Sequence, residues 1–314
     1  MNEPIRTVGI IGAGTIGASW AALFLACGYD VAVHDATPDA GEAFVRGYVE
    51  TAWPALSELG LVKGGTERIS FHKQPEAVAE CCDFIQESVP ERLDIKHALF
   101  ARIEPHLKPK AILASSASGL MVKEMQEGFK NPARFILAHP FNPPHLIPLV
   151  ELLANERTAP DVLEQAEAFY ASAGRVTIRV RKEVPGHIAN RLQAALWREA
   201  IHLVKEGVGT VEDVDKAVSA GPGLRWAVFG PNMIFNLAAA GHGLDMYCER
   251  FADSYHRWWD DMGAPRFTPE VRAALTSGVA EEMHGRSVAE VAKERDQIIV
   301  GILKAARAVR EAKR

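Results

Sequence analysis

The stretch Thr7-Val8-Gly9-Ile10-Ile11-Gly12-Ala13-Gly14-Thr15-Ile16-Gly17 decides the fold of this 314-residue chain. Its first five residues form a short, nearly continuous apolar run, which predicts a buried parallel strand. The glycines are followed by a second apolar run, residues 18–26, which predicts a helix that ends near Gly28. Residues 30–34 predict another strand. The glycine loop therefore joins a strand to a helix within a βαβ unit.

This βαβ unit predicts a binding site for a dinucleotide. Gly12 permits the tight turn, Gly14 lets a pyrophosphate approach the backbone, and Gly17 lets the helix pack on the strand. The N–H groups at the start of the helix are donors for the phosphates. The residues expected to contact the cofactor in this loop are Gly12, Gly14, Thr15, Ile16 and Gly17.

Asp35 directly follows the second strand, roughly 20 positions after the first glycine. A carboxylate there accepts hydrogen bonds from the adenosine ribose and repels a 2′-phosphate, which favours NAD over NADP. The alternative is a βαβ unit whose glycines serve packing only, but that reading does not explain Asp35. FAD shares this loop pattern, and no further flavin signature is present. We therefore expect NAD as the cofactor.

The alternation of strand and helix continues through the first half and then stops. Further strands are expected at residues 69–71, 83–86, 111–114, 134–138, 149–153 and 176–180, and helices at 38–61, 75–80, 94–103 and from 121. Beyond 185, helices are expected at 188–205, 210–219, 232–239, 244–259, 268–281 and 287–310, with an irregular loop at 221–231. The predicted fold is α/β: a Rossmann-type doubly wound parallel sheet forming an NAD-binding domain (1–184), followed by a smaller all-α domain for substrate binding and dimerisation (185–314).

The overall composition is that of an ordinary globular protein, with 48% hydrophobic and 24% charged residues. The net charge is −5 without a long block of one sign, which argues against nucleic acid or an anionic membrane as a partner. No apolar run is long enough to span a bilayer, and no signal peptide is expected. The cysteines lack metal-ligand spacing, so we expect free thiols, no metal and a reducing, cytoplasmic compartment. They are Cys27, Cys81, Cys82 and Cys248.

Polar side chains follow two further strands of the predicted sheet. Residues 87–91 come after one strand, and the serine-rich residues 115–118 come after another. Ligands bind at the carboxyl ends of strands in open α/β sheets, so the serines are candidates for contacts to a substrate hydroxyl or amide. N-capping of the helix that starts near Met121 is an equally weighted alternative.

The segment from His139 to Glu151 holds four prolines between one strand and the next. Proline fixes φ and removes N–H donors, so this segment is expected to be a stiff, extended loop. If it doubles back, it brings Glu151 to the imidazole of His139 and fixes its tautomer. Oxidation of a secondary alcohol by a nicotinamide requires a base for the hydroxyl proton, and histidine is the usual choice. The alternative is a capped loop histidine and an exposed glutamate. His145 lies past the strand end and is expected at the rim of the substrate site.

Six motifs in this order resemble the L-3-hydroxyacyl-CoA dehydrogenase family. They are residues 12–17, residues 87–91 with Lys96, residues 115–118, residues 139–143, Glu151, and the segment Pro185-Gly186-His187-Ile188-Ala189-Asn190-Arg191-Leu192. The resemblance implies a Rossmann domain, a helical dimerisation domain, and NAD-linked interconversion of an L-3-hydroxy compound and its 3-keto form. It makes His139 the base and Glu151 its orienting partner.

The same resemblance assigns further roles. Ser118 and Asn190 would hold the substrate oxygen or the imidazole, and Asn142 would contact the nicotinamide region. The remaining cofactor contacts would come from Ser88, Glu91, Lys96 and Ser116.

Within the family, several segments resemble L-gulonate 3-dehydrogenase (lambda-crystallin) and L-carnitine dehydrogenase more than the acyl-CoA branch. They are residues 85–92, 116–120, 142–144, 223–227 and 295–297. Arg225 and Trp226 stand where the acyl-CoA branch tends to carry uncharged residues. Arg225 would hold a small carboxylate through two parallel hydrogen bonds, or form a salt bridge across a dimer. Trp226, Tyr247, Trp258 and Trp259 would form a cation–π cage, or belong to a core or interface.

Three functions remain open at this point. The favoured one is an NAD-dependent dehydrogenase of a small free L-3-hydroxy acid, acting as a homodimer through its helical domain. An L-3-hydroxyacyl-CoA dehydrogenase of fatty-acid oxidation is the alternative, with Lys63, Arg68 and Lys73 near the CoA phosphates. A non-catalytic structural or NAD-sensing protein is the third, and it does not need His139, Glu151, Ser118 and Asn190 together.

Overall fold

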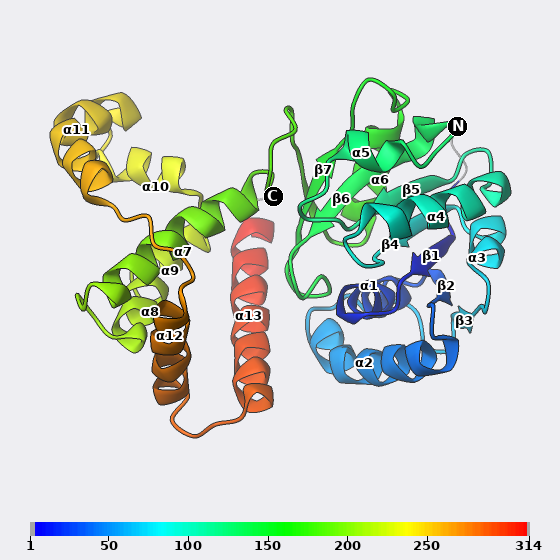
Figure 1. Ribbon diagram of the computed structural model, residues 1–314, viewed down its shortest axis with the longest axis horizontal. Coiled ribbons are helices and arrows are strands. Elements are labelled where there is room, and N and C mark those ends of the chain that lie inside the picture. The colour runs from blue at the N-terminus through cyan, green and yellow to red at the C-terminus, as the bar shows by residue number, and fades with distance from the viewer. Residues whose placement is uncertain (1–3, 313–314) are drawn as a thin grey trace. The chain divides into compact units, whose positions relative to one another are not determined.

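The computed structural model describes residues 4–312 and separates the chain into two compact units. The first ends at Ala189 and the second begins at Asn190, a few residues after the expected boundary. Figure 1 shows the difference in character: the first unit is built on a sheet, and the described part of the second contains helices only.

The first unit holds an eight-stranded sheet in the order β3-β2-β1-β4-β5-β6-β7-β8. All neighbouring strands are parallel except β6 and β7, which pair antiparallel. The predicted doubly wound sheet is therefore confirmed, with one antiparallel pair inside it. The strands are β1 (Thr7–Ile11), β2 (Asp30–His34), β3 (Ile69–Phe71), β4 (Phe84–Glu87), β5 (Ile112–Ser115), β6 (Phe135–Pro140), β7 (Leu149–Leu153) and β8 (Val176–Arg179).

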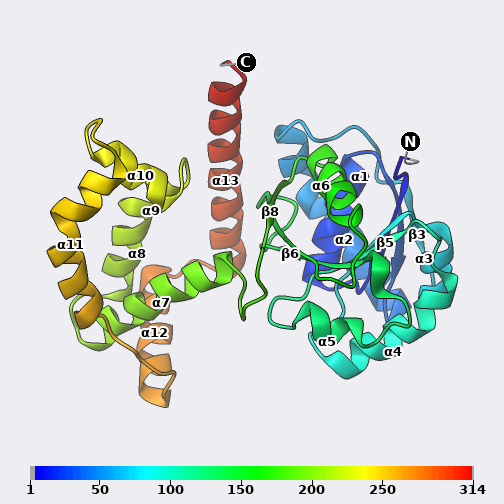
Figure 2. The same cartoon turned by 90° about the horizontal axis from the view of Figure 1, so that it is seen from above.

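Helices cover both faces of this sheet (Figures 1 and 2). One face carries α1 (Thr15–Ala26), α2 (Pro38–Glu58) and α6 (Val162–Ser172); the other carries α3 (Pro75–Cys81), α4 (Leu93–Ile103) and α5 (Val122–Gln126). The sequence reading missed α6, although Phe169 and Tyr170 of this helix pack on the sheet against Phe84. Helix α1 has no polar face, because every residue from Gly17 to Ala26 is buried.

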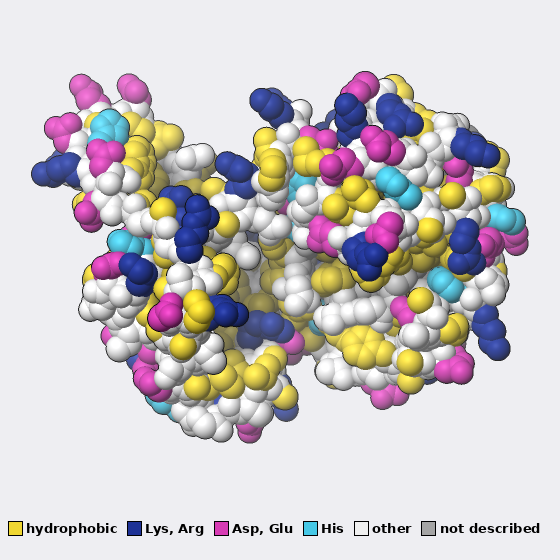
Figure 3. Space-filling view, viewed as in Figure 1, with side chains coloured by type: hydrophobic (Ala, Val, Ile, Leu, Met, Phe, Trp, Pro, Cys, Tyr) yellow, Lys and Arg dark blue, Asp and Glu magenta, His cyan; other side chains and the backbone are white. Residues whose placement is uncertain are grey.

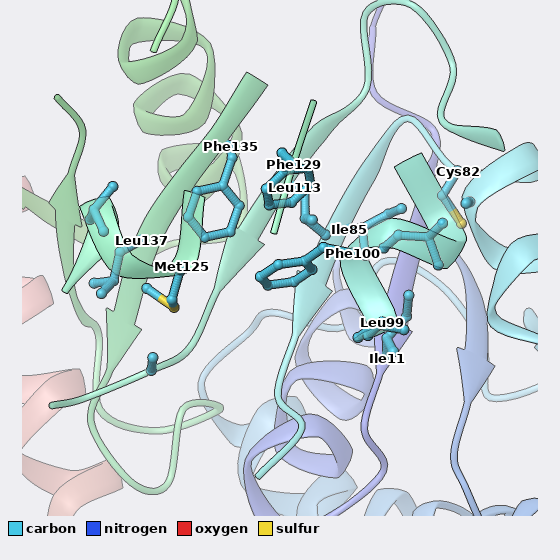
Figure 4. Packing of buried hydrophobic residues seen from close by; sticks show 14 of the residues in the cluster. Ile11, Cys82, Ile85, Leu99, Phe100, Leu113, Met125, Phe129, Phe135 and Leu137 are labelled. Carbon is cyan, nitrogen blue, oxygen red and sulfur yellow. The ribbon is translucent and has the colours of Figure 1, made fainter. Parts of the chain in front are cut away.

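The core beneath α3, α4 and α5 is built from alternate residues of the central strands (Figure 4). Ile85 and Leu113 point to this face and meet Phe100 and Phe129, whose rings stack with centroids 4.5 Å apart. Both faces of the sheet are apolar, as expected for strands covered on two sides. This rigid sheet holds the strand ends in fixed positions.

The second unit consists of helices whose bounds lie close to those expected. Thr210 caps α8 as predicted, since its hydroxyl accepts from the N–H of Asp213 and its own N–H bonds the Asp213 carboxylate. The irregular loop expected at 221–231 is wrong in part, because residues 222–226 form α9. Pro222 at its start has the φ that a helix needs. The helices are α7 (Ala189–Lys205), α8 (Val211–Ser219), α9 (Pro222–Trp226), α10 (Pro231–Ala238), α11 (Gly243–Asp261), α12 (Pro269–Glu282) and α13 (Val288–Glu311).

Charges of both signs are interspersed on the face shown in Figure 3, without a large patch of one sign. All four cysteines are free, as expected. Within residues 4–312, no helix is long and apolar enough to cross a membrane, and no cluster of His, Cys, Asp and Glu is suited to a metal ion.

Candidate active site

The glycine loop after β1 has the geometry expected of a phosphate-binding turn. Gly12 has φ +97°, and a Cβ there would lie 2.6 Å from the backbone of Ser88. A Cβ on Gly17 would collide with the carbonyl oxygen of Gly12 at 1.9 Å, so this glycine serves close packing. A Cβ on Gly14 would meet no atom within 4 Å. The open space at Gly14, next to the N-terminus of α1, fits a pyrophosphate.

Asp35 closes the loop from the end of β2. One carboxylate oxygen accepts from the N–H of Ala13 at 2.8 Å, and the other accepts from the N–H and hydroxyl of Thr37 at 2.9 and 2.8 Å. Burial alone raises the pKa of Asp35, but these hydrogen bonds outweigh it and hold the pKa below its usual range. Asp35 is therefore a charged acceptor next to the loop, as recognition of a ribose requires.

Ser88 and Ser116 meet at the carboxyl ends of β4 and β5, where their hydroxyl oxygens are 2.9 Å apart. Gln86 lies beneath them and donates to Ser116 at 2.7 Å. The hydroxyl of Tyr170 in turn donates to the Gln86 side chain from the buried side. A series of hydrogen bonds from Tyr170 of α6 through Gln86 therefore holds the two serines in place.

Lys96, which was expected to contact the cofactor, is buried. Its side chain is 1% exposed, and its ammonium donates to both carboxylate oxygens of Glu87 at 2.6 and 2.8 Å. Ser115 also donates to Glu87, at 2.6 Å. The contacts among Lys96, Glu87 and Ser115 hold the ends of β4 and β5 together. The role of Lys96 in binding the cofactor stays a prediction.

Glu91 holds the loop that carries Ser118. Its carboxylate accepts from the hydroxyl and N–H of Ser118, both at 2.9 Å, and from the N–H groups of Gly119 and Leu120. The alternative for this serine is wrong: the N-cap of α5 is Met121, and the carboxylate of Glu124 closes this cap. Burial alone would raise the pKa of Glu91. Its hydrogen bonds, those from Gly119 and Ser118 first, outweigh this effect and hold the pKa below its usual value.

His139 and Glu151 are direct cross-strand partners in the antiparallel pair of β6 and β7. His139 Nδ1 lies 2.8 Å from Glu151 Oε2, and both side chains are buried. The predicted return of the chain is therefore confirmed as a β6–β7 hairpin. The alternative of an exposed Glu151 is wrong, because its exposure is 0%.

The second oxygen of Glu151 binds the backbone at the start of α7. Glu151 Oε1 accepts from the N–H groups of Ile188 and Ala189 at 3.0 and 2.9 Å. Burial raises the pKa of Glu151, but the hydrogen bonds from His139, Ala189 and Ile188 together lower it. Asn190, the next residue, is the first of the second unit, so its predicted contact with the substrate stays a prediction.

The proline loop is held by two residues that the sequence reading missed. Ser19 of α1 contacts His145 twice: the hydroxyl accepts from the His145 N–H at 2.9 Å and pairs with ring Nδ1 at 2.8 Å. His145 is 4% exposed, so its expected place at the substrate rim is wrong. Buried Arg175 donates to the carbonyls of Pro144 and Ile147. Asn142 is exposed at the start of the loop.

Two further substrate candidates of the second unit lie on α9. Arg225 is exposed in the last turn of α9. Burial and the hydrogen bond with Tyr247 raise the pKa of Tyr255 of α11, and the positive charge of Arg225 acts in the opposite direction. Trp226 buries its indole nitrogen without a partner among the described residues. Trp258 and Trp259 are more than half exposed beside Tyr255. The proposed clamp and cage belong to this unit, and their action on a substrate stays a prediction.

Known proteins match nearly the whole chain. Residues 7–184 match the NAD-binding domain of 3-hydroxyacyl-CoA dehydrogenase, and residues 186–268 match its C-terminal domain. L-carnitine dehydrogenase of Streptomyces coelicolor is 44% identical over 304 residues, which cover 96% of this chain and 95% of the relative. The enzyme of the same name from Pseudomonas putida is 41% identical over 302 residues, 96% and 94% of the two chains.

Solved structures show the same fold. The crystal structure of 5-formyl-3-hydroxy-2-methylpyridine 4-carboxylic acid 5-dehydrogenase, an NAD⁺-dependent dismutase, is similar with a TM-score of 0.83 at 29% identity, covering 97% of this chain and 99% of the other. The 3-hydroxyacyl-CoA dehydrogenase of Archaeoglobus fulgidus has a TM-score of 0.67 at 25% identity, covering 95% and 98%.

The cofactor and the class of reaction follow from these matches together with the geometry of the loop. NAD is the cofactor, and a CH–OH group is the reacting group of a small molecule. By the match of its two domains and its identity to these relatives, the chain belongs to the 3-hydroxyacyl-CoA dehydrogenase family.

Proposed function

We propose that this protein oxidises the 3-hydroxyl of a small free L-3-hydroxy acid, with His139 as the base and Glu151 as its partner. One observation carries the proposal: the 2.8 Å contact between His139 Nδ1 and Glu151 Oε2 at the carboxyl end of β6. β6 ends at the same edge of the sheet as β1 and its glycine loop, since β1, β4, β5 and β6 are parallel. A base at that edge suits a reaction with a bound nicotinamide.

The chemistry of the pair follows from its hydrogen bonds. When His139 donates its Nδ1 proton to Glu151, Nε2 is left to accept the proton of the substrate hydroxyl. The carboxylate then stabilises the imidazolium that forms, and burial strengthens this attraction because water screens it less. Bound NAD supplies the hydride acceptor. Glu151 acts without changing its own protonation state, as its lowered pKa favours the charged form.

The remaining predicted site residues take part in holding the ligands. Ser118 and Asn190 orient the substrate oxygen, and the domain of residues 1–184 binds NAD while residues 185–314 contribute to the substrate side. The residues proposed to contact NAD are Gly12, Gly14, Thr15, Ile16, Gly17, Asp35, Ser88, Glu91, Lys96, Ser116 and Asn142. Support comes from the open space at Gly14 and from Asp35, Ser88 and Ser116, which directly follow the ends of β2, β4 and β5.

The first substrate to test is L-carnitine, because relatives of that name share up to 44% identity over nearly the full chain. The carboxylate of such an acid would bind exposed Arg225, and its trimethylammonium group would bind the aromatic rings around Tyr255. L-Gulonate is the second free acid. A CoA thioester of fatty-acid oxidation is the competing substrate.

We also propose a homodimer formed through the second unit. Leu192, Leu196 and Trp197 of α7 are 60%, 40% and 53% exposed, and further large apolar side chains of this unit are exposed as well. Exposed large apolar side chains of this kind suit an association surface, and two-fold dimers are the commonest assembly. The free cysteines support a reducing, cytoplasmic compartment.

The test is a panel of NADH-formation assays with L-carnitine, L-gulonate, L-3-hydroxybutyrate and its CoA thioester. His139→Asn serves as the control, since it keeps a polar side chain but removes the base. Turnover of a free acid that this substitution abolishes supports the proposal. Turnover of the thioester alone overturns the substrate class, and tight NADH binding without any turnover supports a non-catalytic protein. Light scattering of the wild-type protein tests the dimer.

A further inference from the structure

A second histidine, His187, lies beside His139 and has no role in the proton transfer proposed for His139 and Glu151. Their ring centroids are 5.6 Å apart at an interplanar angle of 57°. Both residues belong to the first unit. His187 is 1% exposed, yet neither ring nitrogen has a hydrogen-bond partner among residues 4–312. The two nitrogens of an imidazole are one donor and one acceptor when neutral, and leaving such groups buried without partners is unfavourable.

The backbone at His187 is also unusual. His187 has φ +49° and follows Gly186 at φ +74°, so two successive residues are left-handed. Such a conformation is uncommon for a residue with a side chain, and residues that adopt it cluster at functional sites. The turn is fixed from the other side, because Glu151 accepts the N–H groups of the next two residues. Glu151 therefore positions both histidines, one through each of its oxygens.

Electrostatics favours the neutral form of His187. Burial first, and then the positive charge of His139, lower the pKa of His187; Glu151 and Glu91 act in the opposite direction. A neutral His187 offers an N–H donor from one of its ring nitrogens. It is therefore suited to bind an oxygen atom of the molecule whose hydroxyl His139 deprotonates.

The proposed substrate class has such an oxygen at the right separation. In a 3-hydroxy acid the reacting carbon and the carboxylate carbon are separated by two carbon–carbon bonds of about 1.5 Å each. Two rings with centroids 5.6 Å apart are thus close enough to bind the hydroxyl and the carboxylate of one molecule. We infer that His187 is a specificity-determining residue that donates a hydrogen bond to the carboxylate of the substrate. This inference rests on the proposed free-acid function, and it gives the carboxylate a ligand in addition to the proposed Arg225.

The experiment compares L-3-hydroxybutyrate with its primary amide, which has the same shape but no charge. The readout is the ratio of kcat/KM for the acid to kcat/KM for the amide, in the wild type and in His187→Phe. Phenylalanine keeps the ring volume and removes the donor. The amide carbonyl also accepts a hydrogen bond, but a hydrogen bond to the charged carboxylate is stronger. This ratio is therefore expected to fall about 5- to 10-fold. His187→Asn tolerates a left-handed backbone and keeps a donor, so it should restore part of the ratio.

The outcomes separate this inference from the proposed function. If both substrates slow equally in His187→Phe and the ratio is unchanged, His187 is structural and the inference is wrong. If the substitution weakens NADH binding instead of changing the ratio, the ring binds the cofactor, and the inference is again wrong. A wild-type enzyme that oxidises only the CoA thioester refutes the proposed function and the carboxylate ligand with it. Thermal unfolding of both variants shows whether loss of folding explains a loss of rate.

Discussion

Replacing Glu151 by glutamine tests the geometry of the active site most directly. The carboxylate accepts on both oxygens: Oε2 from His139, and Oε1 from the N–H groups of Ile188 and Ala189. Glutamine has only one oxygen. The two backbone N–H groups can bond only to an acceptor, so the amide oxygen is expected to turn towards them. The amide NH₂ then faces His139 and forces Nδ1 to accept, which places the ring proton on Nε2.

His139 in this tautomer cannot take the hydroxyl proton. General-base catalysis contributes about 10²- to 10⁴-fold, so we expect kcat to fall by that factor. At 1.36 kcal/mol per tenfold, this corresponds to about 3–5 kcal/mol of transition-state stabilisation.

The assay is steady-state NADH formation at saturating NAD, with NADH affinity measured separately by fluorescence. Glu156→Gln is the matched control, because Glu156 is exposed shortly after the same strand. NADH affinity should stay unchanged in both variants. A Glu151→Gln enzyme that folds normally and keeps kcat within about threefold of the wild type would refute the assignment of the base pair, because a real general base contributes far more.

Three further predictions follow from contacts of the first unit. Gly14→Ala should leave the urea midpoint nearly unchanged, because its Cβ meets no protein atom, but it should weaken NADH binding at least tenfold, because the Cβ occupies the space expected for the pyrophosphate. Gly17→Ala should instead destabilise the fold, because its Cβ collides with Gly12. Lys96→Met should lower the free energy of unfolding by about 3–5 kcal/mol, since it leaves Glu87 charged and buried; an unfolding midpoint equal to the wild type would contradict the role of this pair. The lowered pKa of Glu91 contributes stability that is complete above the unfolded value of about 4.3 and is lost as the pH falls through the lower folded value. Glu91→Gln should remove this part of the acid dependence, and an identical decline in urea midpoint for both proteins would count against it.

Much of the first unit could be predicted from sequence, because the determining signals are local. The strand, glycine loop and helix at residues 7–26 follow one another without interruption. The positive φ of Gly12 and the close packing at Gly17 are the features that their spacing predicts. The pairing of His139 with Glu151 was also predictable, since the prolines between them exclude a helix and leave a return of the chain.

What sequence reasoning missed depends on contacts between distant residues. Helix α6 supplies Tyr170, whose hydroxyl reaches Gln86 and thereby steadies the serines at the strand ends. His145 lies in a loop past the strand end, which suggested the rim of the substrate site, but Ser19 of α1 binds it in the interior. Tyr170 is far from Gln86 in the sequence, and Ser19 is far from His145. Similarly, only the folded structure shows that Glu151 also binds the segment next to His187.

The antiparallel strand β7 explains why one glutamate can serve both histidines. A parallel neighbour of β6 would run in the same direction, and a crossover would separate its residues from the proline loop. An antiparallel partner instead places a residue directly opposite His139, with its side chain on the same face of the sheet. Glu151 meets His139 there through one oxygen and leaves the other for the chain entering α7. Because a shift of one residue in this register would turn Glu151 to the opposite face, the prolines and their anchors, Ser19 and Arg175, preserve the active site by preserving the register.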